Sequence, residues 1–136
     1  MARLVLTNAY ISVGGVDLSD NVASVTLNSP RDVIETSAFS STAAKTRVSG
    51  LADNSISLEF HQDYTTSDVE QTIYPLLGTA AAIIVKPNGA STSAFNPSYT
   101  CSAVISEWTP LNGSVGELAT ASVTWPITGA ITKAVA

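Results

Sequence analysis

The chain reads S-I-S-L-E-F-H over residues 55–61, and this stretch decides the fold class. Ile56, Leu58 and Phe60 alternate with polar residues, which is the period of a strand with one packed face and one solvated face. The same alternation recurs over residues 23–28 and 119–125, where the polar positions are mostly Ser and Thr. These three stretches predict amphipathic strands whose solvated faces are rich in hydroxyl groups.

Further strands are expected over residues 10–13, 81–85 and 99–108. One amphipathic helix is expected over about residues 67–77, because Ser67 and Glu70 have the spacing of a capping box and an apolar stripe follows them. We therefore expect residues 1–136 to form a single all-β domain. Its architecture is a sandwich or barrel of about seven or eight strands with one short helix.

Residues 29–50 show neither a helical nor a strand period, although a regular strand flanks them on each side. So long a connection is uncommon in a compact domain unless it has a function. It carries Val33, Ile34, Phe39 and Val48, which is too much apolar surface for a solvated segment. The sequence therefore predicts a long loop that packs against a partner, such as another copy of the chain.

The composition also indicates partners. Charged residues make up 12% of the chain and hydrophobic residues 45%, so a free monomer would expose a poorly charged surface. The net charge of −5 argues against a protein that grips nucleic-acid phosphates. No apolar run is long enough to span a bilayer, and the first residues lack a signal-peptide pattern, so no membrane anchor is expected.

The residue types of an active site are scarce. The single histidine, His61, excludes a site with two histidine ligands, and residues 17–21 lack the pattern of a calcium loop. Cys101 is the only cysteine and lies in an apolar stretch, where a buried, inert thiol is expected. The sequence predicts no metal site, no cofactor and no enzymatic activity.

Several segments, in their order along the chain, resemble the tail tube (major tail) proteins of long-tailed bacteriophages of the siphophage type. Residues 32–39 and 44–51 resemble the long loop of that family, and residues 55–64 resemble the strand that follows it. Residues 67–78 resemble its single helix, and residues 112–126 resemble its C-terminal strand region. The resemblance covers essentially the whole chain.

This resemblance implies a structural virion protein. Members of the family form hexameric rings that stack into a hollow tube, and each subunit contributes four strands to a continuous inner barrel. The helix lies outside, the long loop reaches the neighbouring ring, and double-stranded DNA passes through the lumen during ejection. The implied partners are further copies of the chain and the tail tip, tail terminator and tape measure proteins. The implied location is the tail of the virion, after assembly in the host cytoplasm.

Two sets of candidate site residues follow. The contacts of the long loop between subunits and rings are expected at Asp32, Val33, Ile34, Glu35, Phe39, Lys45 and Arg47. Acidic residues in the lumen would repel DNA phosphates and keep the duplex from sticking. The candidates for this role are Glu59, Asp63, Glu107 and Glu117.

Three alternatives remain open at this point. A tail-completion or head–tail joining protein would form one ring and stop. A tube protein of a contractile tail or secretion system would lie inside a sheath. A carbohydrate-binding β-sandwich would use Trp108 and Trp125 as stacking platforms.

Overall fold

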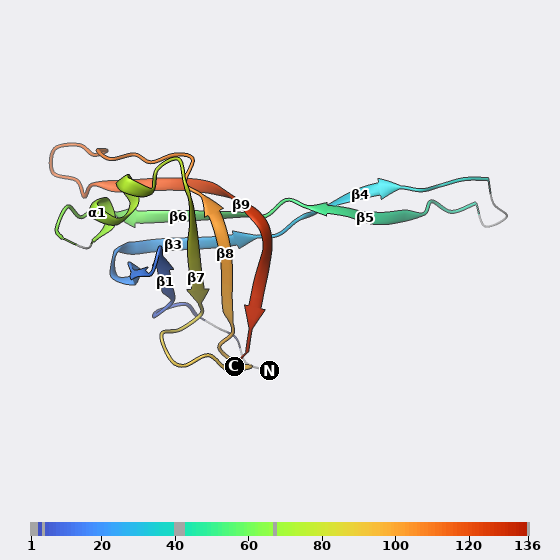
Figure 1. Cartoon of the computed structure of the whole chain (residues 1–136), viewed down its shortest axis with the longest axis horizontal. Helices are drawn as coiled ribbons and strands as arrows, with labels where there is room; N and C mark the ends of the chain where they lie inside the picture. Colours follow the sequence, from blue (N-terminus) through green and yellow to red (C-terminus); the bar gives the residue numbers. More distant parts are fainter. Residues whose placement is uncertain (1–2, 4, 40–42, 67, 136) are drawn as a thin grey trace.

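The computed structural model describes residues 3, 5–39, 43–66 and 68–135 (Figure 1). Most of its elements are β-strands, joined by one short α-helix and two 3-10 turns. In chain order they are β1 (Tyr10–Val13), β2 (Val16–Asp17), η1 (Ser19–Asn21), β3 (Val22–Asn28), β4 (Arg31–Glu35), β5 (Arg47–Ala52), β6 (Ser55–His61), α1 (Val69–Ile73), η2 (Tyr74–Leu76), β7 (Ala80–Lys86), β8 (Ser98–Val104) and β9 (Thr120–Ala134).

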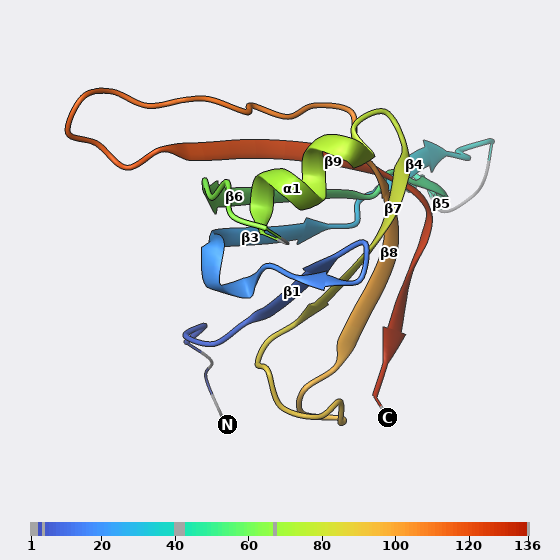
Figure 2. The ribbon, with the colours of Figure 1, turned by 60° about the vertical axis from the view of Figure 1, so that its left-hand side comes forward.

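Seven strands form one antiparallel sheet in the order β2-β1-β7-β8-β9-β6-β3. β9 belongs to both halves of this sheet, because residues 120–126 pair with β6 and residues 127–134 pair with β8. The register shifts beside Cys101, where Gly129 has a φ of 84°, a conformation that glycine adopts without strain. β9 therefore bends and the sheet curls into a half-barrel (Figures 1 and 2), which confirms the all-β expectation.

The inner face of the curled sheet holds the hydrophobic core. Phe60 is fully buried there, with its ring centroid 5.6 Å from that of Trp108 and 6.2 Å from that of Trp125. α1 packs against this face through Val69 and Ile73, which are also fully buried. Each such aliphatic side chain contributes about 2 kcal/mol when it leaves water, so the short helix is held by packing rather than by its own propensity.

The helix is shorter than the expected span of 67–77. α1 ends at Ile73, and Pro75 continues the chain as the 3-10 turn η2. The predicted capping box is wrong, because Asp68 is the N-cap and accepts a hydrogen bond from the Val69 amide. The Glu70 carboxylate instead bonds a side chain outside the helix, and Ser67 lies outside the described residues.

The strand expected over residues 99–108 ends earlier than predicted. β8 stops at Val104, and residues 105–119 run alongside the first half of β9 without regular structure (Figure 2). Trp108 lies in this irregular segment, where its indole Nε1 donates to Glu70 Oε2 at 2.7 Å. The segment is therefore joined to α1 by a side-chain hydrogen bond and does not pair with the sheet as a strand.

The expectation of a structureless loop over residues 29–50 is wrong. β4 and β5 pair antiparallel as a two-stranded hairpin that extends the β3–β6 pair beyond the body of the molecule (Figure 1). Pro30 interrupts the strands at the base, where its carbonyl accepts the Asp53 amide. The strand period is absent from the sequence because neither face of the hairpin is buried in the chain itself, so no apolar–polar alternation is required.

Asn54 fixes the base of this hairpin against the bend of β9. Its side chain is buried, accepts a hydrogen bond from the Ser29 hydroxyl and donates one of 3.0 Å to the Gly129 carbonyl. Its own carbonyl accepts the amide of Ile127 at 2.9 Å. A single buried amide thus joins the start of the hairpin to the corner of the half-barrel.

Candidate assembly surfaces

The outer face of β3, β6 and the first half of β9 is lined by small polar side chains, and we call it the polar wall. The strand register places them in rows across the sheet. One row is Thr26, Ser57 and Thr124, and in it the hydroxyls of Ser57 and Thr124 are 3.1 Å apart. Side chains that both donate and accept hydrogen bonds therefore cover most of this face.

Two of the four candidate lumen acids lie on the polar wall. Glu59 is in the row with Ser24 and Ser122. Glu107 comes from the irregular segment, and its Oε1 accepts the backbone amide of Thr124 at 2.8 Å. Both carboxylates border one shallow hollow of about 220 Å³ on this face. The structure thus brings together Glu59 and Glu107, which are far apart in the sequence.

The cationic side chains lie elsewhere. All six are among the described residues, and none of them belongs to the strand stretches that build the polar wall. Three are on the hairpin, one is near the N-terminus and two are near the ends of β7 and β9. They are Arg31, Lys45, Arg47, Arg3, Lys86 and Lys133. Acidic and hydroxyl groups therefore set the electrostatic character of the polar wall.

The other two candidate lumen acids lie off the polar wall. Asp63 follows β6, and its carboxylate accepts hydrogen bonds of 2.9 and 2.7 Å from the amide and hydroxyl of Thr65. These bonds lower the pKa of Asp63, since they favour the charged form. Glu117 is exposed in the irregular segment, where its amide donates to the Ser114 carbonyl at 3.0 Å. Asp63 therefore organises the turn before α1, and Glu117 lies beyond the start of β9.

The hairpin exposes apolar side chains on both faces. Ile34 pairs with Val48 on one face, and Val33 pairs with Ser49 on the other, next to Leu51. The exposed fractions of Val33 and Leu51 are 68% and 81%. Isolated two-stranded hairpins are only marginally stable in water, so a hairpin with two apolar faces needs partners.

The predicted contact residues of the long loop all lie on the hairpin or next to its tip. Phe39 is completely exposed, near the far end of the hairpin. Lys45 lies 3.6 Å from the Glu35 carboxylate, an exposed ion pair that contributes little to stability. Arg47 is paired with Glu35 across the strands, and Asp32 lies beside Gly50 on the face of Ile34. None of these side chains packs on the half-barrel.

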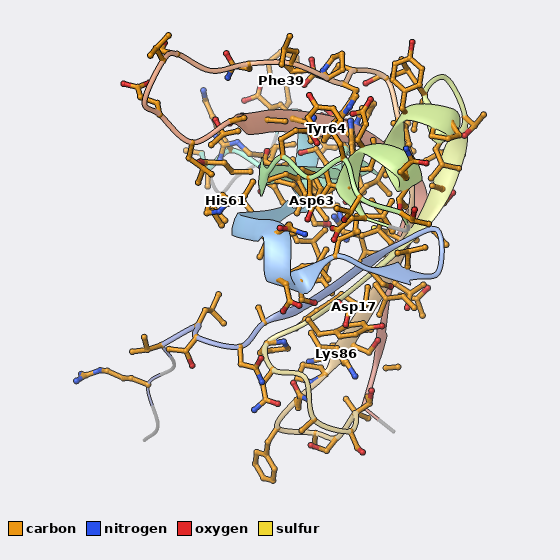
Figure 3. The ribbon with its side chains drawn as sticks, turned by 90° about the vertical axis from the view of Figure 1, so that its left-hand side faces the viewer. Asp17, Phe39, His61, Asp63, Tyr64 and Lys86 are labelled. Atoms are coloured by element: carbon orange, nitrogen blue, oxygen red, sulfur yellow. The ribbon has the colours of Figure 1, made fainter. Side chains whose placement is uncertain are left out.

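Among the residues that the structure describes, no catalytic constellation forms around His61, which ends β6 and projects away from α1 (Figure 3). The Asp17 carboxylate accepts hydrogen bonds from the amide and hydroxyl of Ser19, two residues later, and this bonding pattern is typical of a turn. Among the described residues, no three His, Cys, Asp or Glu side chains are grouped as a metal site requires. Cys101 is buried as expected, and burial raises the pKa of its thiol.

The two tryptophans are not exposed platforms. Trp125 is fully buried and its Nε1 donates to the Glu107 carbonyl at 2.8 Å. Trp108, which belongs to the irregular segment, is buried with its ring against that of Phe60. This removes the basis of the carbohydrate-binding alternative, which needs exposed aromatic faces. Within the described ranges, no helix is long and apolar enough to cross a membrane.

Sequence reasoning missed Asn54 and the role of Glu70. Asn54 stands in D-N-S, a common turn composition, and nothing in that pattern distinguishes a buried amide from an exposed one. Glu70 fits a capping box equally well, and only the fold brings Trp108 within reach of it. Both residues connect segments that are distant in the sequence.

The architecture is that of a curled antiparallel sheet with a projecting hairpin, and solved structures share it. A chain of the virion of a native gene transfer agent particle superposes with a TM-score of 0.73 at 12% identity, over 93% of this chain and 95% of that chain. The fold is therefore one found in a chain of a virion. No family model matches the sequence, and no curated protein matches it either.

Two further structures extend this similarity. A chain of the sheath–tube complex of an extracellular contractile injection system, in its extended state, has a TM-score of 0.71 at 13% identity, over 98% of this chain and 93% of that chain. A chain of the tail of an empty gene transfer agent particle, refined with C6 symmetry, has a TM-score of 0.59 at 14% identity, over 82% and 81% of the two chains. At these identities the similarity establishes the fold.

Proposed function

We propose that copies of this chain join into six-membered rings that stack into a hollow tail tube, through which double-stranded DNA passes. The observation that carries the proposal is the polar wall, a surface of hydroxyls and carboxylates without a cation. This surface occurs on a fold shared with chains of particle tails and of a sheath–tube complex. A non-enzymatic, structural role agrees with the same neighbours.

The edges of the polar wall support ring closure. β3 is the last strand of the sheet, so its outer edge has unpaired backbone groups. The opposite edge, along residues 120–125 of β9, pairs with no other strand in the described part of the chain. On the β9 side the Thr124 amide is already bonded to Glu107, so joining the β3 edge of one copy to this side of the next would satisfy the β3 edge and the groups of β9 that remain open. A closed ring of this kind leaves no strand edge exposed.

The dimensions allow a duplex to pass. Three strands per copy in a six-fold ring give 18 strands, and strands about 4.8 Å apart with a tilt of about 40° then give a backbone diameter near 36 Å. A fourth strand per copy, as the family resemblance implies, would widen this to about 48 Å. With roughly 10 Å taken by side chains, either lumen admits a B-form duplex roughly 20 Å across.

The negative charge of the protein would allow DNA to pass through the tube without binding to its wall. Six copies at −5 each give a ring of −30, and the polar wall would present Glu59 and Glu107 to the lumen. Phosphates are repelled by such a surface, while the hydroxyls keep it hydrated. We accordingly assign the lumen role to these two acids rather than to Asp63 and Glu117.

The hairpin would supply the contacts between rings. It stands clear of its own half-barrel, and Val33, Ile34 and Phe39 need cover that the chain does not provide. A neighbouring subunit is the simplest source of that cover. In a tail, the ends of the tube would meet tail tip and terminator proteins, and a tape measure protein would occupy the lumen before DNA. The protein would then reside in the virion after assembly in the host cytoplasm.

Negative-stain electron microscopy of the purified protein over a range of concentrations, beside its size-exclusion profile, tests the proposal. Hollow tubes with six-fold end views are expected. Single rings that never stack would favour the alternative of a tail-completion protein. A protein that stays monomeric after addition of tail tip components would overturn the proposal.

One further candidate follows from the comparisons. The chain from the contractile injection system has nearly the same TM-score as the chain from the gene transfer agent virion, so a tube inside a sheath is equally compatible with the fold. Tubes that recruit a sheath protein from the same genome would identify this variant. Tubes that remain bare in its presence would favour the sheathless one.

A further inference from the structure

A groove opens where β3 runs into the hairpin. It has a volume of about 540 Å³ and lies between the end of β3 and the ends of β7, β8 and β9. Its wall is mostly apolar, with Leu6, Val25, Leu27, Val85, Tyr99 and Ile131 among its lining residues. We call this the seam groove. In the described structure no segment of the chain fills it.

The charge at the seam groove is positive. Lys86 and Lys133 are among its lining residues, and no acidic residue is. Lys86 lies over the Tyr10 ring at 4.7 Å and donates to the Ala90 carbonyl, so its ammonium group is already engaged. Lys133 is exposed and makes no ion pair within 4 Å among the described residues. An occupant of this groove should therefore be apolar and carry a negative charge.

One segment of the same chain has this chemistry. Residues 109–119, which we call the end loop, expose Leu111, Val115 and Leu118, and Val115 is completely exposed. Glu117 is the only charged residue in the end loop. The base of the loop is anchored, because the Pro110 carbonyl accepts hydrogen bonds from the side chains of Gln62 and Tyr64. The loop is thus held in place with its apolar side chains facing solvent.

The end loop cannot reach the seam groove of its own chain. It projects past the start of β9, at the end of the sheet opposite to the hairpin (Figures 1 and 2). The groove is lined by Leu27 and Ser29, where β3 leads into the hairpin. A contact between the two must therefore join different copies head to tail. Contacts of this kind generate closed rings or open stacks.

We propose that the end loop of one copy docks into the seam groove of the next copy, with Glu117 beside Lys133. This inference rests on the proposed self-assembly and names one of its interfaces. The hairpin is the less suitable occupant, because its three cations outnumber Asp32 and Glu35 and would face two lysines. In this arrangement Glu117 orients the subunit contact and does not line the lumen.

A charge-reversal cycle tests the pairing. The measured quantity is the critical concentration for assembly, obtained by pelleting and checked by electron microscopy. Glu117→Lys and Lys133→Glu should each raise it about five-fold or more, since each puts like charges in contact. The double variant should return to within about two-fold of wild type, as expected when the partners are restored. A double variant as impaired as the worse single variant would overturn the docking.

One matched control isolates this pair. Asp20→Lys makes the same kind of charge change at an exposed site away from the seam groove lining, and it should not rescue Lys133→Glu. Rescue by Asp20→Lys would mean that only net charge matters. Tubes that form normally with both single reversals would reject the docking and leave the proposed function standing.

A cross-linking test does not depend on tubes. Val115→Cys and Leu6→Cys are made separately, both at exposed positions, while the native Cys101 is buried. A disulfide-linked dimer is expected when the two variants are mixed under mild oxidation, and not with either variant alone. If wild-type protein forms no rings or tubes even after addition of tail tip components but the mixed dimer appears, the proposed function fails and the docking holds. Absence of the mixed dimer would reject the docking.

Discussion

The Asn54 side chain donates a hydrogen bond of 3.0 Å to the Gly129 carbonyl, and this bond joins the base of the hairpin to the bend of β9. The same amide accepts the Ser29 hydroxyl, and no buried side-chain polar atom is left without a partner among the described residues. A shape-preserving change from Asn54 to Leu should therefore remove both of these hydrogen bonds. We expect a loss of about 1–3 kcal/mol in the free energy of unfolding, measured by urea denaturation.

A matched control is available for this change. Asn112 is exposed and donates to the Thr120 carbonyl at a longer distance, 3.3 Å. Asn112→Leu should change stability by less than about 0.5 kcal/mol, as is typical of surface sites. Equal losses for the two variants would show that the corner does not depend on Asn54.

The bond between Trp108 and Glu70 predicts a second stability effect. Glu70→Ala removes the acceptor of the indole N–H, which should cost about 1–3 kcal/mol and alter the near-UV circular dichroism of the tryptophans. Glu70→Gln keeps an oxygen acceptor at the same position and should retain most of the stability. Identical losses in both variants would mean that the carboxylate charge, rather than the hydrogen bond, matters.

The exposed apolar residues of the hairpin predict an assembly effect. Phe39→Ala and Ile34→Ala should abolish stacking, because burying such a side chain contributes about 2–3 kcal/mol per contact and the contact repeats around each ring. The folded monomer should keep its melting temperature, since neither side chain packs on the half-barrel. Leu77→Ala, at an exposed apolar position after the helix, serves as the control and should stack normally. Normal polymerisation of both hairpin variants would contradict the assignment.

The polar wall predicts how DNA behaves in the tube. Glu59→Lys places a cation in a row of hydroxyls, so its tubes should retain short duplex DNA at low salt and release it as salt is raised. Wild-type tubes should retain none under the same conditions. In particles, the variant should slow DNA ejection while tube morphology is unchanged. Unchanged ejection kinetics would contradict the assignment of Glu59 to the lumen.

The Asp63 turn predicts a pH effect. Hydrogen bonds from Thr65 lower the pKa of Asp63 in the folded state below its usual value of 3.8. The stability it contributes is therefore fully present above the unfolded pKa and is lost as the pH falls through the folded pKa. Asp63→Asn should make acid unfolding less steep in that range, measured as melting temperature against pH. Thr65→Val, which removes only the hydroxyl donor, should give a smaller change in the same direction.

The strands were predictable where one face is buried and the other is wet. Residues 55–61 alternate strictly because Phe60 and its apolar neighbours pack in the core while Glu59 and its polar neighbours face outward. The hairpin was not predictable as strands for the opposite reason. Both of its faces are exposed in the chain, so burial imposes no alternation on β4 and β5.

The site was predictable in part. The hydroxyl-rich faces follow from the alternation itself, and the apolar content of the hairpin indicated contacts outside the chain. The sequence could not predict that Glu59 and Glu107 border the same hollow. Glu107 lies in a segment that pairs with no strand, and only its side chain bonds β9. The end of β8 at Val104 was not predictable, because buried apolar residues occur beyond it at Ile105 and Trp108 although the backbone there is irregular.

The hairpin extends the β3–β6 pair along the direction of these two strands, and this has a mechanical consequence. A pull on the hairpin along its length would load the ladders of β3 with β6 and of β6 with β9 in shear. In shear, all hydrogen bonds of a ladder resist together, whereas a force across the strands would open them one at a time. A filament built on such links would be stiffest in tension along the direction in which its hairpins point.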